Sequence, residues 1–198
     1  CDGKYVKNKS WWFNGKKKKK KDSILSEQEG LPFWDSTNYE FDLMVSDPLS
    51  HIDTFIALGP SKIILHKKSI TVEALLQYFE SMPDIVRQMI SFGIALQVDD
   101  DPAEIAPLVP YLRRVQCMGI EHIGVQGQPF NERTIEMVQK VHDLYGETLR
   151  ISVDGGVNSE NIPALVKAGA RRLVVGSAVF QSIDPHCTIE MLQNIANS

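Results

Sequence analysis

The sequence predicts an α/β fold in which parallel strands alternate with helices. From about residue 39 onward, apolar strand patterns and helical patterns follow one another at a spacing typical of βα units. The stretch 149–180 contains a complete βαβ pattern, with strand-like runs at 149–153 and 172–175 around a helical apolar set. A glycine turn follows each of these strands, Gly155-Gly156 and Gly176-Ser177. Such turns at the carboxyl ends of parallel strands favour anion binding, because backbone N–H groups can approach a ligand there.

The elements can be assigned in order along the chain. Strands are expected at 39–45, 62–65, 93–97, 114–119, 149–153 and 172–175. Helices are expected near 48–58, 72–81, 103–111, 132–145, 159–168 and 188–196. Apolar positions in these helices, such as Ile135, Val138 and Val141, have the spacing of a face that packs on the sheet.

The stretch 14–38 interrupts this order. It contains six consecutive lysines, 16–21, and then Gly30 and Pro32. A block of like charge is typical of a solvated, mobile segment, and the glycine and proline leave room for a short helix at most. We therefore expect an irregular, lysine-rich insertion within a single domain that spans 1–198; contact of the lysines with nucleic acid or acidic lipid is the less favoured interpretation.

Composition limits the classes of function. A chain of 198 residues with 43% hydrophobic content can bury one large core. The net charge of -4 gives no reason to expect nucleic-acid binding, and no apolar run approaches the roughly 18 residues of a membrane helix. Cys1, Cys117 and Cys187 lack metal-ligand spacing and indicate free thiols in a reducing compartment. We expect a cytoplasmic protein with no nucleic-acid or membrane partner.

The run LRISVDGGVNSENIPALVKAGARRLVVGSAVF at 149–180 resembles the ribulose-phosphate 3-epimerase family. In that family a strand ending in V-D-G-G carries a catalytic aspartate, and a later G-S-A turn helps to hold the phosphate. The resemblance extends through FDLMVSDPLSHIDTF (41–55), GIALQVDDDPAEIAPLVPYL (93–112) and GQPF (127–130). The opening DGKYVKN (2–8) is similar to the family's D-G-x-F-V-x-N segment.

The resemblance implies a (β/α)8 TIM barrel of the phosphate-binding type. The opening segment would close the second strand. The first strand, the first helix and most of the second strand would then be missing. One catalytic aspartate and one metal-binding histidine of the family would be missing with them. The implied reaction is conversion of D-ribulose 5-phosphate to D-xylulose 5-phosphate in the pentose phosphate pathway. It would be performed by a homo-oligomer with a divalent metal ion, Mn, Mg, Fe or Zn.

Two carboxylates are the expected centre of this chemistry. Asp42 alternates with the apolar Phe41 and Leu43, which predicts that Asp42 points into the barrel, where an unpaired carboxylate is costly. By resemblance it replaces a metal-binding histidine, a change that favours Mn²⁺ or Mg²⁺ over Zn²⁺; a carboxylate at the rim is the alternative. Asp154 would be both a metal ligand and the catalytic acid/base, with a simple Asp-Gly turn as the alternative.

The remaining candidates concern the substrate. Phosphate is expected at Gly155, Gly156, Gly176 and Ser177. By resemblance Met118 would lie beneath the substrate, with core packing as an equal alternative. Gly127 belongs to the counterpart of a phosphate loop, 123–128, which lacks the family's proline and one glycine.

His66 stands at the histidine of an H-x-E segment whose glutamate is here Lys68. It is interpreted equally well as a structural histidine or as a ligand.

These residues are consistent with three functions: a metal-assisted epimerase, a phosphosugar-binding homologue without turnover, and a decarboxylase or aldolase of similar fold. The absence of a clear catalytic lysine in the barrel interior counts against the third. Because these residues offer one strong proton carrier, Asp154, we expect the chain to bind ketose phosphates but to show little or no epimerisation.

Overall fold

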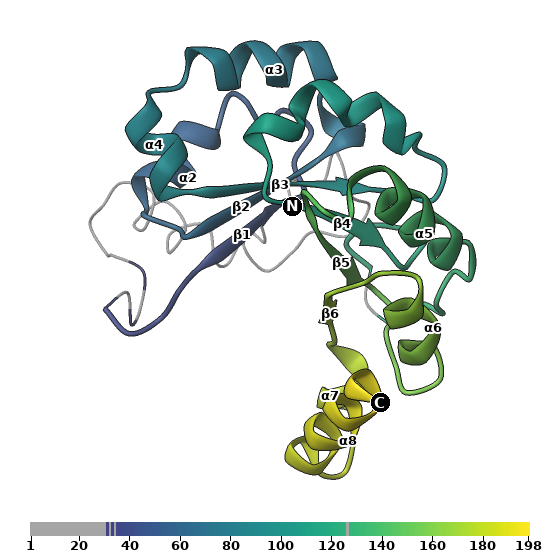
Figure 1. Cartoon of the computed structure of the whole chain (residues 1–198). Coiled ribbons are helices and arrows are strands. Elements are labelled where there is room, and N and C mark those ends of the chain that lie inside the picture. The colour runs from purple at the N-terminus through teal and green to yellow at the C-terminus, as the bar shows by residue number, and fades with distance from the viewer. Residues whose placement is uncertain (1–30, 32, 34, 126) are drawn as a thin grey trace.

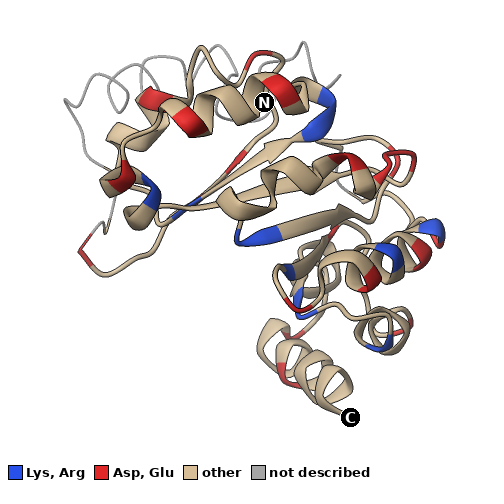
Figure 2. Ribbon diagram, turned by 45° about the horizontal axis from the view of Figure 1, so that its top comes forward, with Lys and Arg blue, Asp and Glu red and all other residues tan. Residues whose placement is uncertain are grey.

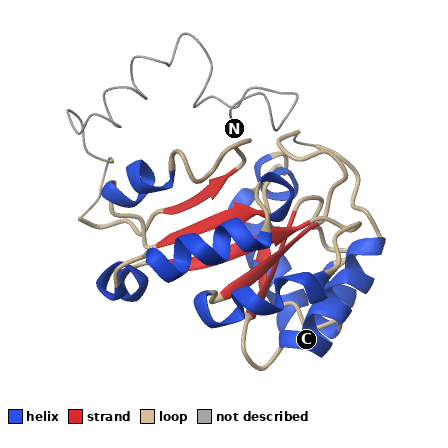
Figure 3. Cartoon of the chain, turned by 90° about the horizontal axis from the view of Figure 1, so that it is seen from above, coloured by secondary structure: helices blue, strands red, loops and turns tan. Residues whose placement is uncertain are grey.

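The computed structural model describes residues 31, 33, 35–125 and 127–198. Six strands form one parallel sheet in the order β1-β2-β3-β4-β5-β6. The sheet is curled, and helices cover its convex side (Figures 1 and 3). The strands are β1 (Glu40–Leu43), β2 (Lys62–His66), β3 (Ser91–Leu96), β4 (Arg114–Met118), β5 (Arg150–Asp154) and β6 (Arg172–Val174). All six lie where the sequence predicts them; the opening segment 2–8 and the lysine run lie outside the described residues.

The helices follow the predicted order with four differences. They are α2 (Ile52–Ala57), α3 (Val72–Ser81), α4 (Asp84–Met89), α5 (Arg133–Tyr145), α6 (Ile162–Lys167), α7 (Ser177–Phe180) and α8 (Pro185–Asn197), with 3-10 helices η3 (Lys67–Ser69) and η4 (Pro102–Tyr111). The short helices η3, α4 and α7 have no counterpart in the prediction. The expected helix 103–111 is a 3-10 helix, because Pro107 and Pro110 lack the N–H groups that an α-helix needs. No helix of the described part of the chain is long and apolar enough to cross a membrane.

The two faces of the sheet have different neighbours. On the convex side, the buried core joins Leu43 and Val45 of the β1 region to the covering helices. Its aromatic centre is Phe79, whose ring is stacked on Tyr111 at 5.4 Å and lies edge-on to Phe92 at 5.1 Å. On the concave side, a smaller apolar cluster consists of Ile64, Ala95, Met118 and Ile123, with Met44 packed against it. The predicted alternation along β1 is therefore confirmed, since Met44 and Leu43 belong to opposite faces.

Candidate active site

A carboxylate on the concave face is held at both of its oxygens. Asp42 Oδ1 lies 2.7 Å from His66 Nε2, and Asp42 Oδ2 accepts a hydrogen bond of 3.1 Å from Gln116 Nε2. The three residues come from β1, β2 and β4, and both His66 and Gln116 are 1% exposed. The Asp42 side chain remains 23% exposed, so its carboxylate faces the open interior with two buried partners behind it. His66 is thus a partner of Asp42.

Asp154 ends β5 beside Met118 of β4 and Val174 of β6. Burial raises the pKa of Asp154 to about 6, and the negative charge of Asp42 acts in the same direction. His66 and Arg172 oppose this shift. A carboxyl group with such a pKa can both take up and return a proton near neutral pH, as general acid/base catalysis requires. The electrostatic coupling also indicates that Asp42 and Asp154 belong to one site.

The described side chains do not form a complete metal site. Both oxygens of Asp42 already accept hydrogen bonds, from His66 and Gln116. Among the described residues, no group of three or more His, Cys, Asp or Glu side chains gathers closely enough to hold an ion. Divalent ions bind through several such donors at once. The ligand roles expected for Asp42 and Asp154 therefore stay predictions.

The two glycine turns lie side by side at the carboxyl end of the sheet, because β5 and β6 are paired neighbours. Gly155 and Gly156 have φ angles of 107° and 67°, which favour glycine. The carbonyl of Gly156 accepts hydrogen bonds from the side chains of Asn158 and Asn161, at 3.2 and 3.0 Å, and these bonds fix the first turn. By contrast, a Cβ placed at Gly176 would meet no atom within 4 Å. The second turn therefore borders open space, next to the exposed Ser177.

Met118 and Gly127 lie on the same side of the molecule. Met118 is 2% exposed and packs in the concave apolar cluster, with its Sδ 3.6 Å from Gln116 Nε2. Gly127 has a φ of 74° and open space around its Cα. The side chain of Gln128 closes its loop by donating to the carbonyls of His122 and Val125. Met118 thus lies beside Asp154, its register partner in β5, and Gly127 belongs to the loop that follows β4.

Gln116 is the site residue that sequence analysis missed. Its position alternates with Met118 along a buried strand, which would have indicated a polar side chain on the concave face. A glutamine carries no titratable signal, however, and its partner Asp42 is 74 residues away in sequence. The contact emerges only when the sheet is assembled.

A model of the ribulose-phosphate 3 epimerase family matches residues 28–180. The chain belongs to this family. Among curated relatives, ribulose-phosphate 3-epimerase from Helicobacter pylori (strain J99) is 32% identical over 161 residues, covering 77% of this chain and 69% of the relative. The Schizosaccharomyces pombe enzyme of the same name is 30% identical over 156 residues, covering 79% of this chain and 65% of the relative. The chain therefore spans about two thirds of the length of these carbohydrate-phosphate epimerases.

Solved structures support the fold. The crystal structure of KGPDC from Streptococcus mutans matches with a TM-score of 0.60 and 11% identity, covering 83% of this chain and 74% of that one. A 3-hexulose-6-phosphate synthase matches with a TM-score of 0.58 and 18% identity, covering 90% and 82%. The predicted α/β class is confirmed, with the six described strands forming part of a (β/α)8 barrel.

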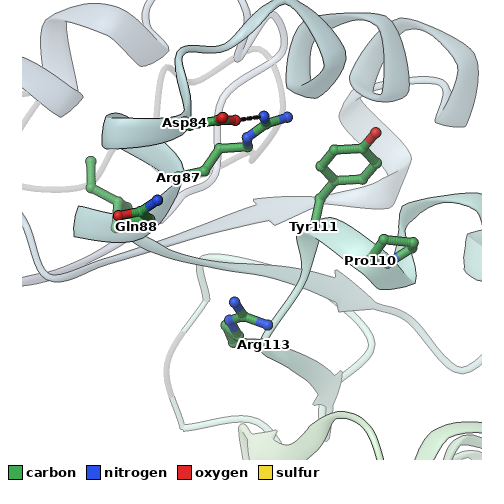
Figure 4. A pocket seen from close by; sticks show the side chains of 7 residues that line it. Asp84, Arg87, Gln88, Pro110, Tyr111 and Arg113 are labelled. Carbon is green, nitrogen blue, oxygen red and sulfur yellow. Dashed lines mark hydrogen bonds and ion pairs between the residues drawn. The ribbon is translucent and has the colours of Figure 1, made fainter.

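A pocket of about 250 Å³ lies elsewhere, at the amino-terminal side of the sheet (Figure 4). Its Arg87 forms an ion pair with Asp84, donates to the carbonyl of Phe79 and stacks over the ring of Tyr111. These contacts already engage the guanidinium group of Arg87. The carboxyl end of the sheet is therefore the better candidate for the family's chemistry.

Proposed function

We propose that this family member is an isomerase that transfers a proton at C3 of a ketose phosphate, interconverting D-ribulose 5-phosphate and D-xylulose 5-phosphate. The observation that carries the proposal is Asp154, a half-buried carboxyl group with a pKa of about 6 at the carboxyl end of the barrel strands. Its ionised form takes the proton from C3, beside the ketone, and leaves an enediolate. Return of a proton to the opposite face of C3 gives the epimer.

The remaining requirements are a charge that stabilises the enediolate and a second proton carrier. Asp42, held by His66 and Gln116, is the other carboxylate that faces the same interior. Its expected role is that of a metal ligand. A divalent ion, preferentially Mn²⁺ or Mg²⁺, stays a prediction for this site, as do the cytoplasmic location and the homo-oligomer. When bound, such an ion would supply charge stabilisation at the substrate oxygens.

A second candidate function is a phosphosugar-binding protein without turnover. The single well-placed proton carrier, Asp154, favours it, because epimerisation needs an acid and a base on opposite faces of C3. Incubation with ribulose 5-phosphate in D₂O, followed by NMR at C3, separates the two functions. With one well-placed carrier we expect slow deuteration, with inversion reduced by about 10²–10⁴ relative to a two-carrier site. Binding without any C3 deuteration would favour the second candidate.

Replacement of Gly176 tests the phosphate site. We expect Gly176→Leu to weaken ribulose 5-phosphate binding at least about tenfold, because the new side chain would fill the open space that the phosphate needs. The fold should be retained, since a Cβ at this position meets no atom within 4 Å. Calorimetric titration measures the affinity, and far-UV circular dichroism checks the fold. Unchanged affinity in the folded variant would refute the assignment of Gly155, Gly156, Gly176 and Ser177 to the phosphate.

A further inference from the structure

The opposite end of the concave face carries a layer of charges. Glu40, Lys62, Arg114 and Arg172 are the first residues of β1, β2, β4 and β6, and we call them the amino-terminal charge cluster. Glu40 and Arg114 each lie two residues before a concave-face residue, Asp42 or Gln116, and therefore share that face. Figure 2 shows Lys and Arg at the starts of several strands. Arg114 lies four positions before Met118 along β4, on the order of 13 Å away.

One carboxylate connects the three cations of the cluster. Both oxygens of Glu40 lie 2.8 Å from Arg172 Nη1. Glu40 Oε2 also lies 3.3 Å from Arg114 Nη1 and 3.7 Å from Lys62 Nζ. Glu40 therefore links the edge strands β1 and β6 across the interior of the curled sheet. Three cations share one anion, so the four side chains carry a surplus of two positive charges.

Arg114 makes this surplus costly. Its side chain is 7% exposed, and its stem crosses Gly93, where a Cβ would lie 2.4 Å from Arg114 Cγ. Its Nε is buried and has no hydrogen-bond acceptor among the described residues. A buried donor without an acceptor is unusual, and a buried charge that is only partly neutralised is destabilising. The pKa of Arg114 is lowered, chiefly by burial; Glu40 opposes this, whereas Arg172 and Arg150 add to it.

The outer side of the cluster is accessible to small solutes. Lys62 and Arg172 are 35% and 34% exposed, so they border solvent while Arg114 lies behind them. The cluster has two surplus positive charges, two exposed cationic side chains and the buried Nε–H of Arg114, which has no acceptor among the described residues. These features match a small anion with two negative charges and several acceptor oxygens. Glu40 supplies one negative charge only, so it cannot neutralise all three cations.

We propose that the amino-terminal charge cluster is a second anion site, distinct from the glycine turns, which binds a tetrahedral dianion such as sulfate or phosphate. The anion accepts hydrogen bonds from Arg114 and Arg172 and forms an ion pair with Lys62. It neutralises the surplus charge and stabilises the sheet where β1 and β6 face each other.

The test uses the 198-residue chain with sulfate, inorganic phosphate and chloride at equal ionic strength, so that general screening is the same in each. We expect sulfate and phosphate to raise the unfolding temperature in a saturable way, by roughly 5 °C at a hundredfold excess over Kd. Glycerol 3-phosphate, titrated in parallel, distinguishes a free anion from the phosphoryl group of a metabolite. A rise that is the same in chloride would overturn the proposal.

Variants locate the site. Arg172→Gln should weaken sulfate binding at least about tenfold, since it removes one positive charge and the guanidinium group. Arg171→Gln is the matched control, because Arg171 is exposed, immediately precedes β6 and should leave binding unchanged. Lys62→Gln, at the exposed margin, gives a second reading if Arg172→Gln does not fold. Glu40→Gln should tighten sulfate binding, because it increases the surplus charge.

Gly176→Leu separates this site from the proposed phosphate turns. Sulfate stabilisation that persists in Gly176→Leu and is lost in Arg172→Gln supports the cluster. Loss in Gly176→Leu together with full retention in Arg172→Gln and Lys62→Gln would place the anion at the turns and refute the inference.

Discussion

Asp154→Asn is expected to stabilise the folded protein above pH 6 while it strongly slows proton transfer at C3. The folded-state pKa of Asp154 is about 6, against an ordinary value of 3.8, so the folded state binds this proton more tightly than the unfolded state does. Stability therefore falls as pH rises from about 4 to about 6 and is then constant. This difference corresponds to about 2–3 kcal/mol that the ionised Asp154 costs at neutral pH. Asparagine avoids that cost but cannot accept the proton.

Urea unfolding at pH 4 and pH 8 measures the effect on stability. The variant should gain about 2 kcal/mol or more over wild type at pH 8, with the gain shrinking towards pH 4. Asp143→Asn, on the exposed face of α5, is the matched control and should be neutral within about 0.5 kcal/mol. C3 deuteration should fall at least about 10²-fold in Asp154→Asn alone. A loss of stability at pH 8 would show that the pKa of Asp154 is not raised in the folded state. Undiminished deuteration would show that Asp154 is not the acid/base of this site.

Local sequence patterns were sufficient for the strands and for most of the helices. Val72–Ser81 forms a helix within its predicted limits, because Thr71 caps it and apolar residues recur at helical spacing. Strand alternation was enough to assign Asp42 to the concave face. These predictions depend on neighbours within one element, which the sequence displays directly.

Contacts between strands were less predictable. Asp42 is in register with Ile64, yet its carboxylate contacts His66, two residues further along β2. This offset depends on the twist of the sheet and on side-chain length, and neither has a local sequence signature. The amino-terminal charge cluster was missed for the same reason, since Glu40 and Arg172 are 132 residues apart.

Backbone geometry at Gly119 shows how the fold positions the catalytic carboxylate. Gly119 directly follows β4, and its N–H donates a 2.7 Å hydrogen bond to the carbonyl of Asp154. A Cβ at this position would lie 2.0 Å from the carbonyl oxygen of Gly155 and 3.1 Å from the ring of Phe130. The oxygen belongs to the backbone, so the ends of β4 and β5 would have to separate. Only glycine allows the two strand ends to approach this closely.

We therefore expect Gly119→Ala to lower the free energy of unfolding by about 1–3 kcal/mol, the usual cost of forcing extra volume into a packed interior. Displacement of Asp154 by as little as about 1 Å would also reduce C3 deuteration on the order of 10²-fold. Gly176→Ala is the control for stability alone, because its Cβ meets no atom within 4 Å, so that any loss there reports the backbone angles (φ -113°, ψ -85°) and not crowding. Urea unfolding of both variants separates crowding at the β4–β5 junction from a general effect of glycine replacement, and deuteration by NMR is measured on Gly119→Ala against wild type. Wild-type stability and deuteration in Gly119→Ala would mean that the contact between Gly119 and Gly155 does not hold Asp154 in place.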